Sequence, residues 1–371
     1  MATKALGIVF ANMHEDSLGQ LTGERSMASL PFGGRYRLID FYLSSLVGAG
    51  ISKVGVIAKN NYQSLMDHVG SGRAWDLSRK NSGLTVFPPH SLAQEHYYHG
   101  RIQAIHNIIK YIINSNVEYV VMMDCNHVCN IDIRQMIECH INSGADVTMA
   151  CRERIAGEST ASDCIAVHCD DSGRIDDMLI NASDEDSLLS MNVFVISRNL
   201  LVELIEQAHS RMKVFFEQDI LCANIDKLNI HAYKFSGFCR RLYDLKSYFD
   251  ANMALLDPQN MRSLFPEDRP VYTKVRDQAP VRYGLNAHVK NTLAADGCVI
   301  LGDVENCLLF RGVTVGENTT LRNCIVMQDT VIGGDSSLEY VITDKEVTIN
   351  PGHRLTGDEN YPLYIKKLSV I

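Results

Sequence analysis

The sequence has 371 residues, which is enough for one large domain or two ordinary ones with a sizeable buried core. Hydrophobic residues make up 46% of it and charged residues 21%, as in a soluble globular protein, and no apolar run approaches the ~20 residues that a membrane-spanning helix needs. The net charge of −9 argues against a general nucleic-acid-binding protein, so neither a nucleic acid nor a membrane is expected as a partner.

The cysteines and the start of the chain indicate the compartment. There are eleven cysteines, an odd number, scattered between Cys125 and Cys324 without a paired framework. The apolar start of the chain ends at Asn12 and His14, which argues against a secretory signal. Reduced thiols and a cytoplasmic location are therefore expected.

The first predicted elements are a strand and a glycine-containing loop that leads into a helix. Residues 5–10 form an apolar run typical of a buried parallel strand. In the loop, Gly33 and Gly34 allow a backbone turn that side chains would block, and Arg35 and Arg37 stand beside it. Forked guanidinium groups suit phosphate oxygens, and a loop between a strand and a helix near the N-terminus is where nucleotide-binding α/β domains usually hold phosphates.

The segments that follow alternate between strands and helices. A helical period with isoleucines on one face covers residues 101–115, whereas a polar stretch at residues 70–82, which contains Trp75, is expected to be a surface excursion. This alternation predicts a mostly parallel sheet with helices on both faces and sites beyond the carboxyl ends of the strands. The other expected elements are a helix at residues 38–47 and strands at residues 53–58, 119–124, 145–150, 191–196 and 230–233.

The composition changes from about residue 256, where prolines interspersed with charges mark a linker. Further on, the helical period disappears and a 17-residue repeat places Val315, Ile332 and Ile349 at equivalent positions, with Leu321 and Leu338 at the same spacing. Such a repeat, close to three hexads per coil, is typical of a parallel β-helix. The sequence therefore predicts an α/β domain at residues 1–255, a linker at residues 256–285 and a β-helix at residues 286–371.

The N-terminal segment resembles the signature of the ADP-glucose pyrophosphorylase (glucose-1-phosphate adenylyltransferase) family. In catalytic members the first strand is followed by G-G-G-x-G-x-R-L-x-P-L-T and then R-A-K-P-x-x-P-F-G-G, of which residues 18–34 keep most of the frame. Ser17 stands at the arginine, Met27 at the lysine, and residues 11–15 contain no glycine to bring backbone N–H groups onto a triphosphate. The resemblance covers nearly the whole chain and implies an α/β, Rossmann-like nucleotide-diphospho-sugar transferase domain followed by a C-terminal left-handed parallel β-helix.

The catalytic motifs of the family show further losses in this chain. The family holds a divalent metal with two carboxylates, one in S-G-D-H-x-Y, which falls on Asn126, and one in G-Y-W-x-D-x-G-T, which falls on Arg241. The lysine of F-x-E-K-P, which holds the sugar phosphate, falls on Asn181. The motifs Y-x-G-T-A-D-A-V and D-F-G-K-D match residues 98–105 and 215–219, with only part of each retained. The resemblance therefore implies no catalytic residue, no bound metal and no cofactor in this chain.

Asp124 precedes the first lost carboxylate position by two residues in an extended segment, so the two side chains share a face. We expect Arg241 to pair with Asp124 in place of the metal. A metal cluster at Cys125, His127 and Cys129 is the weaker interpretation, because C-x-H-x-C lacks a zinc spacing and has no second half. The vestigial active-site positions are Ser17, Met27, Asp124, Asn126, Asn181 and Arg241.

The function implied by the resemblance is regulation of ADP-glucose synthesis for glycogen. The family places part of its allosteric effector site around the G-G element, which makes Arg35 and Arg37 candidate effector-binding residues, unless they are merely solvated or structurally paired. We expect a non-catalytic subunit that joins a catalytic subunit, as a heterotetramer, and responds to a phosphorylated effector. The partner would make ADP-glucose and pyrophosphate from ATP and glucose 1-phosphate with Mg²⁺. An active adenylyltransferase with a rebuilt site and a stand-alone sensor of sugar phosphates or nucleotides remain as alternatives.

Overall fold

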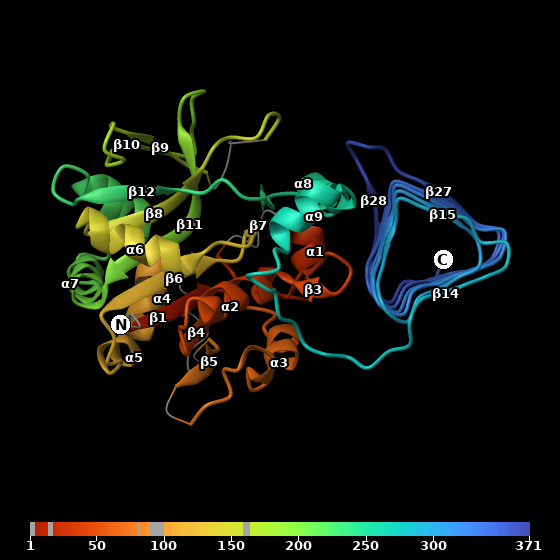
Figure 1. Ribbon diagram of the computed structural model, residues 1–371, viewed down its shortest axis with the longest axis horizontal. Helices are drawn as coiled ribbons and strands as arrows, with labels where there is room; N and C mark the ends of the chain where they lie inside the picture. The colour runs from red at the N-terminus through yellow and green to blue at the C-terminus, as the bar shows by residue number, and fades with distance from the viewer. Residues whose placement is uncertain (1–3, 14–17, 81, 90–99, 159–163) are drawn as a thin grey trace.

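The computed structural model describes residues 4–13, 18–80, 82–89, 100–158 and 164–371, arranged as an α/β domain and a β-helix (Figure 1). Seen down its axis, the β-helix has a triangular cross-section, and helices α8 (Leu245–Met253) and α9 (Pro258–Leu264) lie between it and the sheet of the α/β domain. Within the described part of the chain, none of the helices has the length and apolar character needed to cross a membrane.

A nine-stranded mixed sheet forms the centre of the α/β domain. Its main path runs β10-β9-β11-β6-β1-β4-β5, and β8 pairs with β11 on one side and with β12 on the other. The strands are β1 Ala5–Phe10, β4 Lys53–Ile57, β5 Gly83–Phe87, β6 Tyr119–Asp124, β8 Val147–Arg152, β9 Ile165–Cys169, β10 Ile175–Ile180, β11 Leu188–Ser197 and β12 Ile230–Lys234.

The direction of strand β11 corrects the prediction of a mostly parallel sheet. Strand β1 pairs in parallel with β4 and β6, and β8 with β12, but β11 is antiparallel to β6, β8 and β9. After β8 the chain forms the antiparallel pair β9–β10 and then enters the sheet in the reverse direction. A buried strand has the same apolar composition whether it lies parallel or antiparallel to its neighbours, so the sequence could not distinguish these two orientations.

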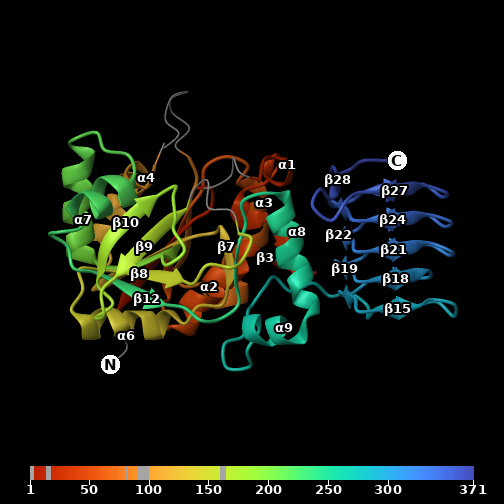
Figure 2. The same ribbon diagram turned by 90° about the horizontal axis from the view of Figure 1, so that it is seen from above.

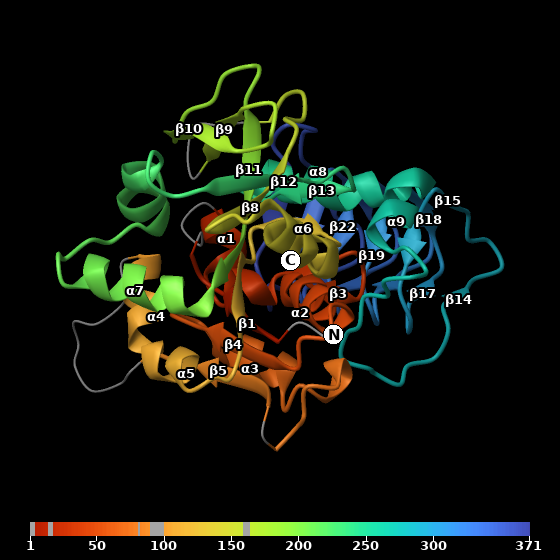
Figure 3. The same ribbon diagram turned by 60° about the vertical axis from the view of Figure 1, so that its left-hand side comes forward.

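Helices cover both faces of the sheet, as predicted (Figure 3). Side chains of α2, α3 and α6 form one apolar cluster with residues of β1 and β4, and side chains of α4, α5 and α7 form another on the opposite face. The predicted helix at residues 101–115 is divided at Ile108 into α4 and α5. The remaining helices are α1 Gly19–Thr22, α2 Leu38–Gly48, α3 Gln63–Val69, α4 Arg101–Asn107, α5 Ile109–Ile113, α6 Ile133–Ser143 and α7 Arg198–His209.

Two stretches predicted to be irregular contain structure. Trp75 is buried rather than part of a surface excursion, and its Nε1 donates a hydrogen bond to the backbone oxygen of Tyr272 (3.2 Å). This polar stretch is therefore attached to the rest of the domain by the buried Trp75 side chain. Helix α9 lies inside the predicted linker, because Pro258 occupies the first helical turn, where proline fits, and Asp257 caps the helix through the N–H of Gln259.

Three parallel five-stranded sheets form the β-helix, and their arrangement fits a left-handed parallel β-helix whose coils stack side by side (Figure 2). Val315, Ile332 and Ile349 are buried and pair in register along one sheet, and Leu321 pairs with Leu338 in the next, which confirms the predicted repeat. The first sheet comprises β14 Arg282–Tyr283, β17 Val299–Ile300, β20 Thr314–Val315, β23 Val331–Ile332 and β26 Thr348–Ile349. The second comprises β15 Val289–Lys290, β18 Asp303–Glu305, β21 Thr320–Arg322, β24 Ser337–Glu339 and β27 Arg354–Thr356. The third comprises β16 Leu293–Ala294, β19 Leu308–Leu309, β22 Ile325–Val326, β25 Val341–Thr343 and β28 Leu363–Ile365.

The β-helix docks on the α/β domain through an apolar cluster and a buried ion pair. Phe310 of the β-helix and Phe32 of the α/β domain belong to the same buried apolar cluster. Arg25 donates from Nη2 to both carboxylate oxygens of Asp344 (2.8 Å each), and the two side chains are 4% and 3% exposed. Tyr364 donates its hydroxyl proton to the same carboxylate (2.7 Å). The contact between the two parts is therefore directional as well as apolar.

Candidate functional site

A largely buried cluster of three charged side chains occupies the carboxyl end of the central strands; we call Arg101, Asp124 and Glu217 the ion-pair cluster. Asp124 ends β6, beside Phe10 at the end of β1, and its carboxylate is fully buried. Nη2 of Arg101 lies 2.8 Å from Oδ2 of Asp124 and 2.6 Å from Oε1 of Glu217. One guanidinium group therefore bridges two carboxylates from different elements.

Local structure fixes the position of the Arg101 guanidinium. Arg101 is the first residue of α4, and Glu217 begins a short helical turn that ends at Leu221. The guanidinium lies 4.9 Å from the ring centre of Phe10 and 5.0 Å from that of Phe194, within cation–π range. The Arg101 side chain is only 3% exposed, so the cluster is held by packing as well as by charge.

The ion-pair cluster corrects the expected pairing of Asp124 with Arg241. Among the described residues, the basic partner of Asp124 is Arg101. Arg101 precedes Asp124 in the sequence, whereas Arg241, the predicted partner, follows it. Arg241 is instead buried on β13 (Cys239–Arg241), opposite His127 of β7 (His127–Cys129), and its guanidinium lies 5.0 Å from the ring of Tyr243. Its guanidinium also interacts with the thiol of Cys164.

The residues present do not fit a Mg²⁺ ion. Asn126, at the first lost carboxylate, has its side-chain oxygen 2.8 Å from Nδ1 of His127, and Arg241 brings a positive charge to the second position. The nearby carboxylate of Asp124 already bridges to Arg101. Mg²⁺ prefers carboxylate and water oxygens in octahedral geometry, and this donor set offers an amide and a cation instead.

The other vestigial positions support the same conclusion. Met27 is buried in an apolar cluster, so no cation replaces the lost lysine there. Asn181 lines a cavity of about 260 Å³ together with Arg101 and Glu217. Because Arg101, the arginine among the described residues of this lining, is already bridged to two carboxylates, these residues offer little attraction for a phosphate. Ser17 lies outside the described residues.

A second candidate site lies where the turn at Gly33 and Gly34 meets the β-helix; we call it the basic pocket. Gly34 has φ of +82°, and a Cβ atom there would come within 2.9 Å of the Leu293 side chain of the β-helix. Helix α8 holds the turn, because Asn252 accepts a hydrogen bond from the Gly33 N–H (3.0 Å). Besides His68, the described lining residues of the pocket include six arginines and lysines: Arg35, Arg37, Lys274, Arg276, Arg311 and Lys345.

The positive charges in the basic pocket are only partly compensated. Arg311 pairs through Nε with Asp296 (3.2 Å), and exposed Arg35 reaches the same carboxylate only at 4.0 Å. Burial, together with the charges of Arg37 and Arg25, lowers the pKa of Lys345 to about 7. Burial also lowers the pKa of Arg37 to about 10. The lowered pKa values show that the charged forms of these side chains are destabilised in the pocket, and a bound anion would stabilise them.

Arg35 and Arg37 therefore share one pocket but differ in their surroundings. Nη1 of Arg37 donates to the backbone oxygen (2.6 Å) and the hydroxyl (2.9 Å) of Ser64, whereas Arg35 is exposed. Sequence reasoning did not find Lys274, Arg276, Arg311 or Lys345, because they lie hundreds of residues from the loop. It also did not find the roles of Arg101 and Glu217, although these charged residues at the threonine and glycine of two family motifs were a usable signal.

Two family models match the chain. The first, described as nucleotidyl transferase, matches residues 16–257. The chain belongs to the nucleotidyl transferase family. The second model, described as GlmU-like, C-terminal hexapeptide, matches residues 278–361, which include most of the β-helix.

Relatives that match most of this chain include two glycogen biosynthesis proteins and a glucose-1-phosphate adenylyltransferase. The chain is 36% identical to the glycogen biosynthesis protein GlgD of Bacillus subtilis (strain 168), over 98% of this chain and 95% of that protein. It is also 36% identical to the GlgD protein of Geobacillus stearothermophilus, over 100% and 98% of the two chains. The glucose-1-phosphate adenylyltransferase of the same species is 32% identical, over 87% and 84%. These relatives confirm the predicted resemblance, and the chain is more similar to GlgD than to that adenylyltransferase.

Proposed function

We propose that this chain is a non-catalytic, regulatory subunit of a glucose-1-phosphate adenylyltransferase and that its basic pocket receives a phosphorylated effector. The observation that carries this proposal is the ion-pair cluster, which puts Arg101 and two carboxylates at the end of β6, next to the lost metal position at Asn126. The names of the GlgD relatives support a role in glycogen biosynthesis. The catalytic partner would supply Mg²⁺ and convert ATP and glucose 1-phosphate into ADP-glucose and pyrophosphate.

Nucleotidyl transfer depends on positioned cations and a metal that neutralise charge in the transition state. Removal of a single electrostatic stabiliser costs roughly 2.7–4 kcal/mol of barrier in other enzymes. In this chain, Asn126 and Arg241 stand where the family has its two metal carboxylates. Asn181 stands where the family has a phosphate-binding lysine. The combined loss of these charged groups should raise the barrier enough to remove measurable turnover, even though the individual effects on the barrier are not additive.

The first experiment compares adenylyltransferase activity of this chain alone, of the catalytic subunit alone and of the two mixed. We expect no turnover by this chain, formation of a mixed oligomer in analytical ultracentrifugation, and altered activity or effector response of the mixture. Coupling of ~1–3 kcal/mol between sites corresponds to a several-fold to hundredfold change in apparent affinity. Mg²⁺-dependent turnover that disappears on mutation of this chain's own cleft would favour the rebuilt-enzyme alternative.

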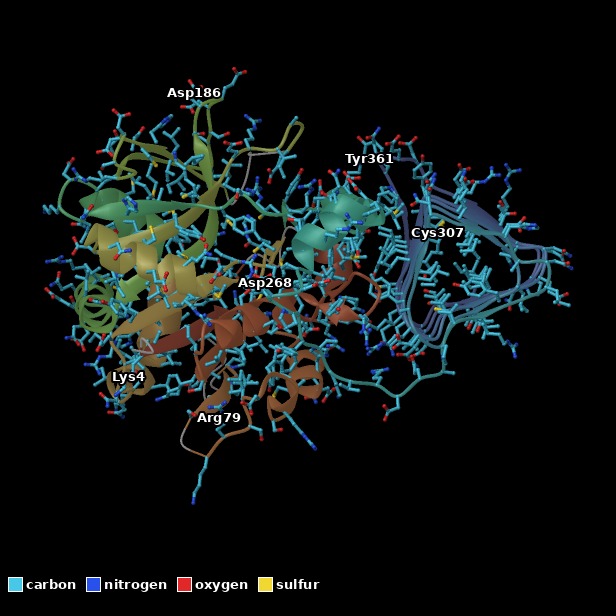
Figure 4. All side chains as sticks on the ribbon, viewed as in Figure 1. Lys4, Arg79, Asp186, Asp268, Cys307 and Tyr361 are labelled. Carbon is cyan, nitrogen blue, oxygen red and sulfur yellow. The ribbon has the colours of Figure 1, made fainter. Side chains whose placement is uncertain are left out.

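The second experiment tests the basic pocket. The double variant Arg35→Ala/Arg276→Ala removes two exposed cations of the pocket, and the matched control Arg79→Ala/Lys80→Ala removes two exposed cations from a distant loop, where Figure 4 labels Arg79. We expect only the first variant to weaken the effector response of the mixture, with little change in melting temperature of either. Arg37→Ala is less suitable, since this residue also anchors Ser64.

The basic pocket is also the observation that favours the second candidate, a stand-alone sensor. All six of its cations come from one chain, so an effector could bind without a partner. The two candidates differ in assembly: a sensor binds the phosphorylated ligand but does not associate with the catalytic subunit. Failure of the two subunits to associate at micromolar concentration, with ligand binding intact, would place the sensor first. The heterotetrameric stoichiometry and the cytoplasmic location stay predictions.

A further inference from the structure

Two cysteines face each other on the short antiparallel strand pair β7–β13. The register places Cys129 opposite Cys239 and His127 opposite Arg241. The N–H of Leu242 donates to the oxygen of Asn126 (2.8 Å), and hydrogen-bonded and non-hydrogen-bonded pairs alternate along such a ladder. The cysteines therefore form a non-hydrogen-bonded pair, in which opposing Cα atoms lie about 4.5 Å apart. Disulfides span Cα separations of about 4.4–6.8 Å, so the backbone already permits one here.

The two thiols are in contact and are not equivalent. A hydrogen bond joins them. Burial raises the pKa of Cys239, but the hydrogen bond from Cys129 and the positive charge of Arg152 outweigh this effect and lower it. The hydrogen bond to Cys239 and burial raise the pKa of Cys129. Cys239 is thus the better nucleophile, and Cys129 is placed to react second.

Cys239 lines a cavity of about 350 Å³, which we call the basic cavity, at the carboxyl ends of the parallel strands β8 and β12. Its charged lining residues are Arg152, Arg154, Lys234, Arg240 and Glu153. Arg152 is compensated by an ion pair with Glu158, while Arg154 and Lys234 are exposed. Cys239 is only 3% exposed, and the cavity that it lines is where a small anion would approach it.

We propose that Cys129 and Cys239 form a redox-active dithiol, which a small anionic disulfide oxidises from the basic cavity. This modification site lies outside the basic pocket and goes beyond the proposed regulatory function. A reactive dithiol fits a chain whose described cysteines are all free thiols. In a reducing compartment such a pair is transient and responds to redox conditions.

The chemistry is two successive thiol–disulfide exchanges. The Cys239 thiolate attacks one sulfur of the small disulfide, the sulfur–sulfur bond of that molecule breaks, and the first thiolate leaves and takes up the proton lost by Cys239. The Cys129 sulfur then gives up its proton and attacks Cys239, which releases the second small thiol. Two protein thiols and one small disulfide thus become one protein disulfide and two small thiols.

A matched internal control lies in the β-helix. Cys307 and Cys324 are also hydrogen-bonded to each other and completely buried, on adjacent coils, and Figure 4 labels Cys307 there. Neither of them lines the basic cavity. If burial and thiol contact alone decided reactivity, this second pair would react as readily as the first. If access through the basic cavity decides it, only Cys129 and Cys239 react.

The test uses the full chain under native conditions with oxidised glutathione, an anionic disulfide, as the probe. We expect each chain to lose two hydrogens, and peptide mapping to join Cys129 to Cys239 while Cys307 and Cys324 stay reduced. The Cys129→Ser variant should instead hold glutathione on Cys239, because the second exchange cannot occur. The Cys239→Ser variant should form neither product.

The role of the basic cavity is tested by charge reversal. Arg154→Glu/Lys234→Glu changes two exposed side chains and should slow oxidation by oxidised glutathione about tenfold or more, within the range of electrostatic steering. The rate with uncharged 2-hydroxyethyl disulfide should be unchanged. The proposal is overturned if another cysteine pair is joined first, or if the wild-type chain reacts only in denaturant. It is also overturned if glutathione on the Cys129→Ser variant maps to a residue other than Cys239.

Discussion

Replacement of Arg101 by methionine tests the ion-pair cluster directly. Methionine keeps the length and apolar stem of the side chain but removes the guanidinium, which leaves the buried carboxylate of Asp124 and the nearly buried one of Glu217 facing each other. Breaking a buried ion pair on one side costs about 3–5 kcal/mol, because the remaining charge stays buried without its partner. The cation–π contacts with Phe10 and Phe194 are lost as well.

This loss should appear in thermal unfolding. For a domain of 150–250 residues, 1 kcal/mol shifts the melting temperature by about 2–4 °C, so the Arg101→Met variant should melt roughly 6–20 °C lower than the wild type. The triple variant Arg101→Met/Asp124→Asn/Glu217→Gln keeps the shape of the cluster but carries no charge. It should recover a large part of the loss, since replacement of a whole buried ionic cluster is often nearly neutral.

The control is Arg79→Met, which removes an exposed arginine paired with Asp76 and should change stability by less than ~0.5 kcal/mol. Scanning calorimetry of the four proteins at one pH and ionic strength is the measurement. An Arg101→Met variant that melts with the wild type would refute the argument, because the two carboxylates would then not depend on Arg101. A triple variant less stable than Arg101→Met would show that packing, and not charge, determines the cost.

Three further substitutions test the same reasoning. Arg25→Met leaves the carboxylate of Asp344 buried without its partner and should lower the free energy of unfolding by about 3–5 kcal/mol. Calorimetry should then show a lower melting temperature, and an unchanged melting temperature would contradict this prediction. Lys345, with its pKa lowered to about 7, is charged in the folded protein below pH 7 and loses its charge above it, so sulfate should bind several-fold more tightly at pH 6 than at pH 8, and Lys345→Met should abolish that difference. Since the unfolded lysine titrates near pH 10.5, this residue should also make folding stability rise with pH between about 7 and 10.5, which urea titrations of the wild type and Lys345→Met can compare. Gly34→Ala should lower both stability, by about 1–3 kcal/mol, and sulfate affinity, because alanine disfavours a φ of +82° and its Cβ would meet Leu293; normal sulfate binding by this variant would argue against a pocket built on the turn.

The architecture could be predicted from the sequence where one pattern repeats. The 17-residue spacing of Val315, Ile332 and Ile349 identified the β-helix because every coil imposes the same inward position. Strand β11 shows the limit of such patterns, since its buried run does not record whether it lies parallel or antiparallel to β6. Trp75 shows another limit, because its partner Tyr272 lies almost 200 residues away.

The candidate site could be predicted only in part, for a similar reason. Family motifs aligned Asn126 and Arg241 with the two metal carboxylates, and motif position alone suggested that Arg241 would face Asp124. The basic residue that reaches Asp124 is Arg101, which the start of α4 brings beside the end of β6. Which of two arginines reaches a carboxylate depends on where helices begin and strands pair, and neither is encoded in the spacing of the motif.

The basic pocket draws its cations from three separate parts of the chain, two from each. Arg35 and Arg37 belong to the α/β domain, Lys274 and Arg276 to the segment that precedes the β-helix, and Arg311 and Lys345 to the β-helix itself; these six are the arginines and lysines among its described lining residues. Each pair alone would hold a phosphate weakly, and high affinity requires all three at a fixed distance from one another, as with the arms of a chelator. Occupancy of the pocket would therefore depend on the position of the β-helix relative to the α/β domain. A partner subunit that tilts the β-helix would change the affinity for the ligand without contacting the ligand.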